Sequence, residues 1–294
     1  MRFRRILAAT DFSPASRPAV RAAAKLAASH RGVVWITHAV APVYDAMGGL
    51  PRMYREMQSF VESEARRRLS RAVASVRKTG ANVRPLELHG PAADAIRTAA
   101  RVRRADLVVV GTHGRTGLPR LLLGSIASRI VATAPCPVLA VSRGRFSGRV
   151  QRIVFGTDFS DASRRAWATA VSLAKSQAAR LRIVHAVAPL AMAQGAAWAY
   201  AEAESAFVAD ARRRLEGLRR AARRAGVRAD AVVARGAAHE ALVRESRGAK
   251  DVWIVVGTHG LTGARGALLG SVASRVVATA PCPVLTVRGR TRTR

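Results

Sequence analysis

Lysine, acidic residues and aromatic residues are all scarce in this chain of 294 residues. Asp and Glu number 18, against 50 Lys and Arg, and only four of those 50 are lysine. Phe, Trp and Tyr together make up 5% of the chain. Because the basic residues are spread over many predicted helices and are not interleaved with aromatic residues, a base-stacking nucleic-acid platform is not expected. The formal net charge of +32 predicts nonspecific, salt-sensitive contact with polyanions, or else reflects a genomic bias toward arginine codons.

Cysteine is too rare for a disulfide framework. Cys136 and Cys282 occupy equivalent Pro-Cys-Pro sequences, with no CxxC motif and no histidine cluster beside them. Neither a disulfide nor a zinc site is therefore expected. We interpret both residues as small buried side chains in a reducing compartment, and we predict a cytoplasmic protein.

Long apolar runs are also missing. The run Ile6–Ala9 stops at Thr10-Asp11, which is too short for the core of a signal peptide. The longest uncharged stretch, Ile183–Ala201, is interrupted by His185 and Pro189. We predict no membrane span.

The chain does contain an internal repeat. Over the 32 positions that begin at Gly111 and at Gly257, 23 residues are identical. Asp11 recurs 147 residues later as Asp158, and Gly111 recurs 146 residues later. A nearly constant offset across each half indicates duplicated domains. We predict domains over 1–142 and 151–288, a linker over 143–150 and a basic tail over 289–294.

Each half alternates short apolar runs with helical patterns, which predicts an α/β fold with a mainly parallel sheet. The expected strands are 6–10, 33–40, 82–89, 107–110 and 138–141 in the first half, and 153–157, 181–187, 229–234, 252–256 and 284–287 in the second. The first helix is expected to have Ser13 as its N-cap and Pro14 at its first position, and to continue to Ser29. Further helices are expected over 53–79, 91–102, 124–133 and 198–225, with a mobile loop over 41–52.

A glycine-rich element follows the fourth strand of each half. It comprises Gly111, Gly114, Gly124 and Ser125 in the first repeat, and Gly257, Gly260, Gly270 and Ser271 in the second. Glycines let the backbone approach a ligand closely, and a helix N-terminus offers free N–H groups to phosphate. The motifs GxxxxGK[ST] and GxGxxG are absent, which excludes a P-loop NTPase and argues against a dinucleotide site. Because ligands bind beyond the carboxyl ends of parallel strands, we expect Asp11, Ala39 and Gly111 to line one cleft.

These motifs resemble those of the universal stress protein family from Phe3 to Val287. The matching features are the Thr-Asp-Phe-Ser sequences after the first strand of each half, the strand-end His38 and His185, the Gly-2x-Gly-9x-Gly-Ser element and the closing PCPVL strand. The glycine element is typical of the ATP-binding branch of that family. The resemblance implies two tandem Rossmann-like, adenine-nucleotide-alpha-hydrolase-like domains, each a five-stranded mainly parallel sheet with helices on both faces. It also implies an intrachain pseudo-dimer through the last strands, with a homodimer as a further alternative.

The resemblance further implies one ATP site in each repeat, with Mg²⁺ arriving with the nucleotide. In the first repeat it assigns to that site Ala9, Thr10, Asp11, Ala39, Val110, Gly111, Gly114, Arg115, Gly124, Ser125 and Ile126. In the second it assigns Gly156, Thr157, Asp158, Ala186, Val256, Gly257, Gly260, Gly270, Ser271 and Val272. Two departures from the family pattern stand out: Leu261 replaces the basic residue found at Arg115, and Ala9 and Gly156 stand where the family often has proline.

Simpler interpretations of these residues remain open. Asp11 and Asp158 could satisfy local N–H groups, and Ser125 and Ser271 could be helix N-caps only. We interpret His113 and His259 as structural, and His38 and His185 as core histidines. No catalytic or metal-binding residue is predicted. The expected function is an ATP-binding stress-response or signalling module without fast catalysis; the alternatives are a slow ATPase or autophosphorylating enzyme, and a polyanion-associating basic protein.

Overall fold

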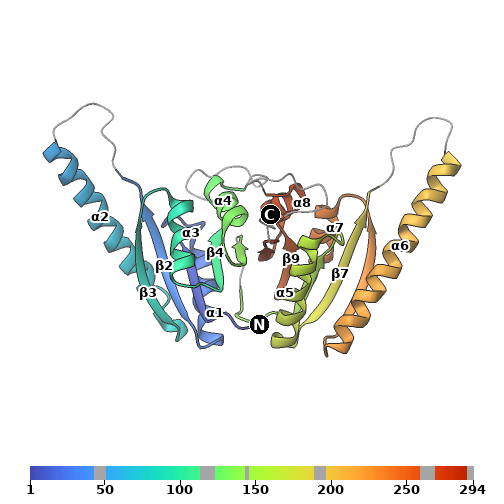
Figure 1. The fold of residues 1–294 in the computed structure, drawn as a ribbon. Coiled ribbons are helices and arrows are strands. Elements are labelled where there is room, and N and C mark those ends of the chain that lie inside the picture. Colours follow the sequence, from blue (N-terminus) through green and yellow to red (C-terminus); the bar gives the residue numbers. More distant parts are fainter. Residues whose placement is uncertain (43–50, 113–122, 143–145, 189–196, 259–268, 290–294) are drawn as a thin grey trace. The chain divides into compact units, whose positions relative to one another are not determined.

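The computed structural model describes residues 1–42, 51–112, 123–142, 146–188, 197–258 and 269–289 (Figure 1). The chain divides into two compact units, Arg2–Gly148 and Arg149–Arg294, with Met1 grouped with the latter. Each unit is an α/β fold with its own five parallel strands. The predicted fold class is therefore confirmed in both halves.

The first unit has a sheet in the order β3-β2-β1-β4-β5. Its strands are β1 (Arg5–Ala9), β2 (Val33–Val40), β3 (Asn82–His89), β4 (Leu107–Gly111) and β5 (Val138–Val141). Its helices are α1 (Arg17–Ser29), α2 (Pro51–Ala74), α3 (Ala92–Val102) and α4 (Ser125–Thr133), with a short 3₁₀ helix, η1 (Arg77–Thr79). All of the strand pairs in this sheet are parallel.

The second unit repeats this arrangement, with strand order β8-β7-β6-β9-β10. Its strands are β6 (Arg152–Gly156), β7 (Arg180–Val187), β8 (Ala229–Arg235), β9 (Val252–Gly257) and β10 (Val284–Val287). Its helices are α5 (Asp161–Gln177), α6 (Ala197–Arg224), α7 (Ala238–Glu245) and α8 (Ser271–Thr279). The ten strands lie within one or two residues of their predicted positions.

The core of each unit is its sheet. In β1 and β4, the side chains of Ile6, Leu7 and Leu107 are completely buried. Continuous apolar runs of this kind are typical of parallel strands covered on both faces. Right-handed crossovers place α1 and α2 on one face of the first sheet and α3 and α4 on the other, where α3 and α4 pack together (Figure 1). No helix in the described ranges is long and apolar enough to cross a bilayer.

The predicted start of the first helix is wrong. α1 begins at Arg17, and Ser16 takes the N-cap position, so Pro14 lies in a turn before the helix. The reason is Pro18, which has no N–H to donate to the carbonyl of Pro14 and whose ring clashes with that carbonyl in a helix. In the second unit Arg165 occupies the equivalent position, and α5 begins directly after its N-cap Ser160, whose side chain accepts a hydrogen bond from the Ser163 N–H.

The limits of the long outer helix also differ from the prediction. α2 already includes Pro51 and ends at Ala74; the following turn leads into η1, which closes at Gly80 with a left-handed φ of 73°. The predicted stop at Gly80 is confirmed, but the helix before it is not continuous. Most of the predicted loop over 41–52 lies outside the described residues.

Candidate functional site

In the first unit, the sheet order reverses between β1 and β4. Chain connections leave these two neighbouring strands in opposite directions, and ligands of open α/β sheets generally bind beyond the carboxyl ends of strands at such a point. Residues that follow β1, β2 and β4 therefore meet at one edge of the sheet. The Thr10 N–H donates to the Thr37 carbonyl of β2 at 2.9 Å, which holds the start of the turn after β1 against the neighbouring strand.

The Thr-Asp-Phe-Ser turn after β1 is fixed by its own side chains. Asp11 Oδ1 accepts hydrogen bonds from the N–H of Ser13 at 3.0 Å and from its hydroxyl at 2.6 Å. Thr10 Oγ1 accepts from the N–H of Phe12 at 3.0 Å. Phe12 has a left-handed φ of 65°, a strained conformation for a residue with a bulky side chain. The turn is therefore held in one conformation that a free chain would rarely adopt.

The second repeat builds the same turn. Asp158 Oδ1 accepts from the Ser160 N–H at 3.1 Å and from its hydroxyl at 2.6 Å, and Phe159 has a φ of 61°. Because the same motif has the same strained geometry in both repeats, the left-handed conformation of the phenylalanine is a property of the motif. The one signal for it in the sequence is the phenylalanine that is present in both copies.

The carboxylate of Asp11 is charged at neutral pH. Partial burial by itself would raise the pKa of Asp11, but hydrogen bonds from Ser13 and Ser16 outweigh burial, and the pKa lies below its ordinary value. The interpretation of Asp11 and Asp158 as acceptors for local N–H groups is therefore confirmed. A carboxylate has two oxygens and about four acceptor positions, so this local role does not exclude a ligand.

The strand-end histidines support the turn. His38 Nδ1 donates to the Thr10 carbonyl at 2.8 Å, and the ring of Phe12 lies over the His38 ring with centroids 4.2 Å apart. In the second repeat, His185 Nδ1 donates to the Thr157 carbonyl at 2.8 Å, and its ring faces that of Phe159 at 4.6 Å. Both histidines are half-buried rather than part of the core, so the prediction was right about their structural role and wrong about their burial.

The N-terminus of α4 is tied to the same edge. The Gly124 N–H donates to the Thr112 carbonyl at 3.1 Å, and the Thr112 N–H donates to Val141 at the end of β5 at 3.3 Å. The first helical bond runs from the Ser128 N–H to the Gly124 carbonyl, so the N–H groups of the three intervening residues have no acceptor within the helix. The equivalent bonds from Gly270 to Thr258 and from Thr258 to Val287 are 2.8 and 3.0 Å.

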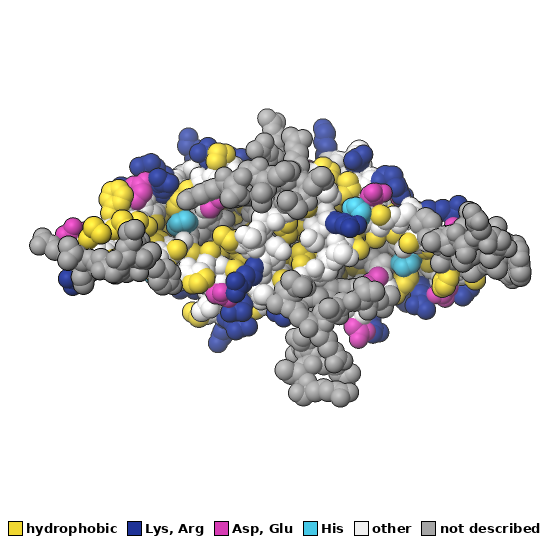
Figure 2. Space-filling view, turned by 90° about the horizontal axis from the view of Figure 1, so that it is seen from above, with side chains coloured by type: hydrophobic (Ala, Val, Ile, Leu, Met, Phe, Trp, Pro, Cys, Tyr) yellow, Lys and Arg dark blue, Asp and Glu magenta, His cyan; other side chains and the backbone are white. Residues whose placement is uncertain are grey.

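The serines of the glycine-rich element are not N-caps. Gly124 and Gly270 occupy the N-cap positions, and Ser125 and Ser271 are the first helical residues, with exposed side chains. The capping-only interpretation is therefore wrong. Beside these serines, Ile126 and Val272 are 51% and 40% exposed. Seen from the side on which the strands end, each unit shows histidine side chains close to acidic and hydrophobic ones (Figure 2).

The other predicted site residues fall into three groups. Val110 and Val256 are buried, so only their backbone faces the edge. Residues near the strand ends that are half-buried are Ala9, Ala39, Gly111, Gly156, Ala186 and Gly257. The described residues do not include Gly114, Arg115, Gly260, Leu261, His113 or His259.

Neither cysteine has the properties of a nucleophile. Cys136 and Cys282 are free thiols, and burial raises the pKa of Cys136 to about 12 and that of Cys282 to about 11. Because the thiolate is the reactive form, both side chains are inert near neutral pH. Among the described residues, no group of three His, Cys, Asp or Glu side chains is arranged to hold a metal ion.

The two units match one family model twice. The model of the universal stress protein family covers residues 2–142 and again residues 149–288. The chain belongs to the universal stress protein family. The resemblance predicted from its motifs is thereby confirmed.

Relatives of this universal stress protein include tandem and single-domain proteins. A universal stress protein of Mycolicibacterium smegmatis is 31% identical over 295 residues, which cover 97% of each chain. One from Thermus aquaticus is 38% identical over 144 residues, which cover 47% of this chain and 98% of the relative. The crystal structure of a universal stress protein from Archaeoglobus fulgidus has the same fold, with a TM-score of 0.72 at 17% identity, covering 97% of this chain and 96% of that one.

Proposed function

We propose that each repeat binds one adenine nucleotide, ATP, at the edge of its sheet where the order of the strands reverses. The observation that carries this proposal is that each repeat brings a fixed, charged carboxylate and the open N-terminus of a helix to the same edge. Asp11 follows β1, and Thr112 and Gly124 place α4 beyond the end of β4, the neighbouring strand. Asp158, Thr258 and Gly270 do the same in the second repeat.

The donors and acceptors at this edge fit the parts of a nucleotide. An aspartate oxygen can accept hydrogen bonds from ribose hydroxyls or from the adenine amino group. The N–H groups in the first turn of α4, which have no acceptor within the helix, and the exposed hydroxyl of Ser125 suit phosphate oxygens. Mg²⁺ would arrive with the nucleotide.

We further propose that occupancy of these sites, rather than fast turnover, is the functional output. Asp11 and His38 are both engaged in holding the turn, so neither is set up as a general base. Four expectations from the sequence stay predictions. They are the pairing of the two closing strands within one chain, a homodimer, nonspecific polyanion contact and a cytoplasmic location.

The test is nucleotide content and ATP affinity. Protein purified in high salt is denatured and its released nucleotide identified by chromatography, and the Kd for added ATP is measured by calorimetry. Asp11→Asn and Asp158→Asn keep an oxygen for the serine N–H but remove the charge. We expect two sites per chain, with each variant weakening one site about tenfold or more, because hydrogen bonds to charged groups contribute about 1.5–3 kcal/mol.

The matched control is Asp106→Asn. Asp106 accepts from the N–H groups of Arg4 and Arg5 at the opposite end of the first sheet, outside the proposed site. The Asp106→Asn substitution should leave the affinity for ATP unchanged. Absence of bound nucleotide together with no binding of added ATP would overturn the proposal, as would an equal loss of affinity in the control.

A further inference from the structure

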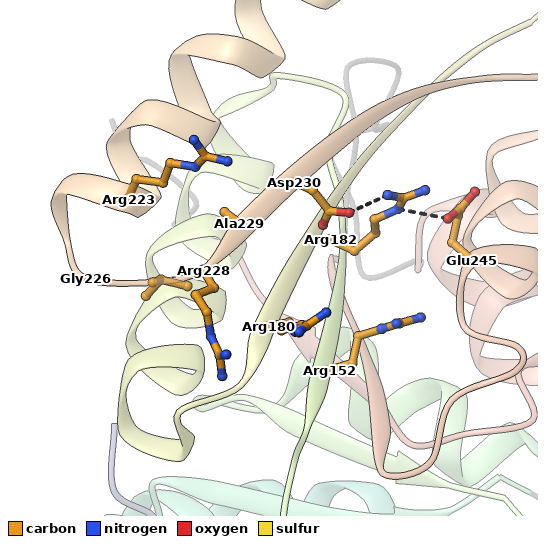
Figure 3. Close-up of a pocket in the computed structure, with 10 residues that line it drawn as sticks. Arg152, Arg180, Arg182, Arg223, Gly226, Arg228, Ala229, Asp230 and Glu245 are labelled. Atoms are coloured by element: carbon orange, nitrogen blue, oxygen red, sulfur yellow. Dashed lines mark hydrogen bonds and ion pairs between the residues drawn. The ribbon is translucent and has the colours of Figure 1, made fainter.

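The second unit has a basic pocket at the end of its sheet opposite the proposed nucleotide site. The cavity has a volume of about 750 Å³ and lies where β6, β7 and β8 begin (Figure 3). Five arginines and two carboxylates line it, a formal excess of three positive charges. The charged residues of this basic pocket are Arg152, Arg180, Arg182, Arg223, Arg228, Asp230 and Glu245.

Its two carboxylates are committed to one arginine. Arg182 donates to Asp230 on β8 and, at 3.0 Å, to Glu245 on α7, as the dashed lines in Figure 3 show. For the other four arginines of the pocket, no carboxylate among the described residues lies within ion-pair range. The pocket thus contains an ion cluster around Arg182 and, among the described residues, four guanidinium groups without an ion pair.

Three of these arginines form a row across the sheet. Arg152 of β6 is in register with Arg180 of β7. The next register pair, Leu181 with Ala229, places Arg228 beside Arg180 at the start of β8. Neighbouring strands lie about 4.8 Å apart, so the row spans roughly 10 Å, more than one phosphate group can bridge.

A second cavity of about 530 Å³ continues from the first. It shares Arg152, Arg180 and Arg228, and adds Arg149 and Lys250 to the lining. Like charges gathered in this way repel one another and destabilise the folded state unless an anion compensates them. Guanidinium groups bind phosphate through two parallel N–H···O bonds, so arginine is the residue best suited to this task.

Two of the three arginines in the row are specific to the second repeat, whereas the third, Arg152, corresponds to Arg5 of the first repeat. At the equivalent positions of the first repeat, Arg180 is replaced by Val33 and Arg228 by Asn82, which are in register in the same way. Trp35 stands in place of Arg182, and the guanidinium of Arg103 lies 5.7 Å from the centre of its ring. The fold itself therefore does not require arginine at the positions of Arg180 and Arg228.

We propose that the basic pocket of the second repeat binds an anion with two or more linked phosphates, either a free polyphosphate chain or the phosphates of a nucleotide. The length of the arginine row, its lack of ion-paired carboxylates among the described residues and the absence of two of its three arginines from the first repeat all support a ligand with several adjacent charges. This site is separate from the proposed nucleotide sites and does not depend on them.

The test uses the full chain and tripolyphosphate as the probe, with binding measured by calorimetry in about 100 mM NaCl. The variant Arg180→Val/Arg228→Asn introduces the residues of the first repeat at two exposed positions, so it should fold. The control Arg165→Gln/Arg212→Gln removes two positive charges from exposed positions on α5 and α6, outside the pocket. We expect the first variant to weaken tripolyphosphate binding at least tenfold and the control to stay within twofold of the wild type. Inorganic phosphate should bind far more weakly.

Competition identifies the source of the phosphates. Displacement of tripolyphosphate from the wild type by ATP would assign the pocket to nucleotide phosphates, and persistence of tripolyphosphate in excess ATP would assign it to free polyphosphate. Arg152→Gln provides a second variant should the first unfold. Undiminished binding in the pocket variants, an equal loss in the control, or binding of duplex DNA but not of tripolyphosphate would overturn the proposal.

Discussion

At the scale of single residues, the clearest difference between the two repeats lies just before the Thr-Asp-Phe-Ser turn. The first repeat has Ala9 there and the second has Gly156. A Cβ atom added to Gly156 would lie 2.8 and 2.9 Å from the two methyl groups of Leu242, and 3.2 Å from Val256. In the first repeat, Ala9 is paired with Ile96, which stands in place of Leu242. We infer that the isoleucine leaves room for the Cβ atom of the alanine.

We predict that Gly156→Ala destabilises the second unit by about 1–3 kcal/mol, because Leu242 is buried and must shift. The double variant Gly156→Ala/Leu242→Ile, which copies the first repeat, should recover at least half of that loss. Urea unfolding of the wild type, both single variants and the double variant measures the coupling. Additive effects of the two substitutions would contradict this explanation.

At the scale of elements, the outer helix α2 is docked along only part of its length. Its C-terminal half buries Ala65, Leu69 and Val73, at intervals of four residues. Nearer its N-terminus, Met53 and Phe60 are 57% and 65% exposed. Tertiary packing therefore stabilises the end of this helix far more than its beginning.

We predict that Leu69→Ala lowers the free energy of unfolding by about 2–5 kcal/mol, since it leaves a cavity between α2 and the sheet. Phe60→Ala on the same helix should change it by no more than about 0.5 kcal/mol, because the side chain is already in water. Urea denaturation followed by circular dichroism compares the two. A loss at Phe60 as large as that at Leu69 would show that the exposed half of α2 is covered in solution.

The elements also show what the sequence could and could not predict. The central strands were predictable because both of their faces are buried, so that runs such as Ile6–Ala8 are uniformly apolar. The start of α1 was not, because Ser13 and Pro14 form a good helix-start signal that Pro18 cancels four residues later. The basic pocket was missed for a different reason: Arg152, Arg180 and Arg228 are separated by 28 and 48 residues and meet only through the register of three strands.

The predicted sites divide in the same way. The motif Thr-Asp-Phe-Ser indicated that a turn follows the first strand. The hydrogen bonds of Asp11 within this turn were predictable because its side chain is short. Phe12 and His38 are 26 residues apart along the chain, and their contact depends on β1 and β2 being neighbours in the sheet. No local pattern carries that information.

At the scale of the whole molecule, the dominant property is a net charge of +32. Self-repulsion of this size opposes the compact state, and salt screens it. We predict that the midpoint of thermal unfolding rises between about 20 and 200 mM NaCl, by roughly 2–4 °C for each kcal/mol of repulsion relieved. Calorimetry at the two salt concentrations checks this. A midpoint that is unchanged or lower would mean that the surface ion pairs outweigh the repulsion.

The hydrogen bonds from Gly124 to Thr112 and from Gly270 to Thr258 have a consequence for how such proteins diverge. They fix both ends of the intervening segment to the sheet. The entropic free-energy cost of closing a segment between fixed ends grows by only about 0.6 kcal/mol for each doubling of its length. Closure entropy therefore places little constraint on the length of this segment. The longest run of differences between the two copies of this element, Leu118–Leu121 against Ala264–Ala267, falls inside that segment. Within this element, the two copies therefore differ most between the two points that are anchored to the sheet.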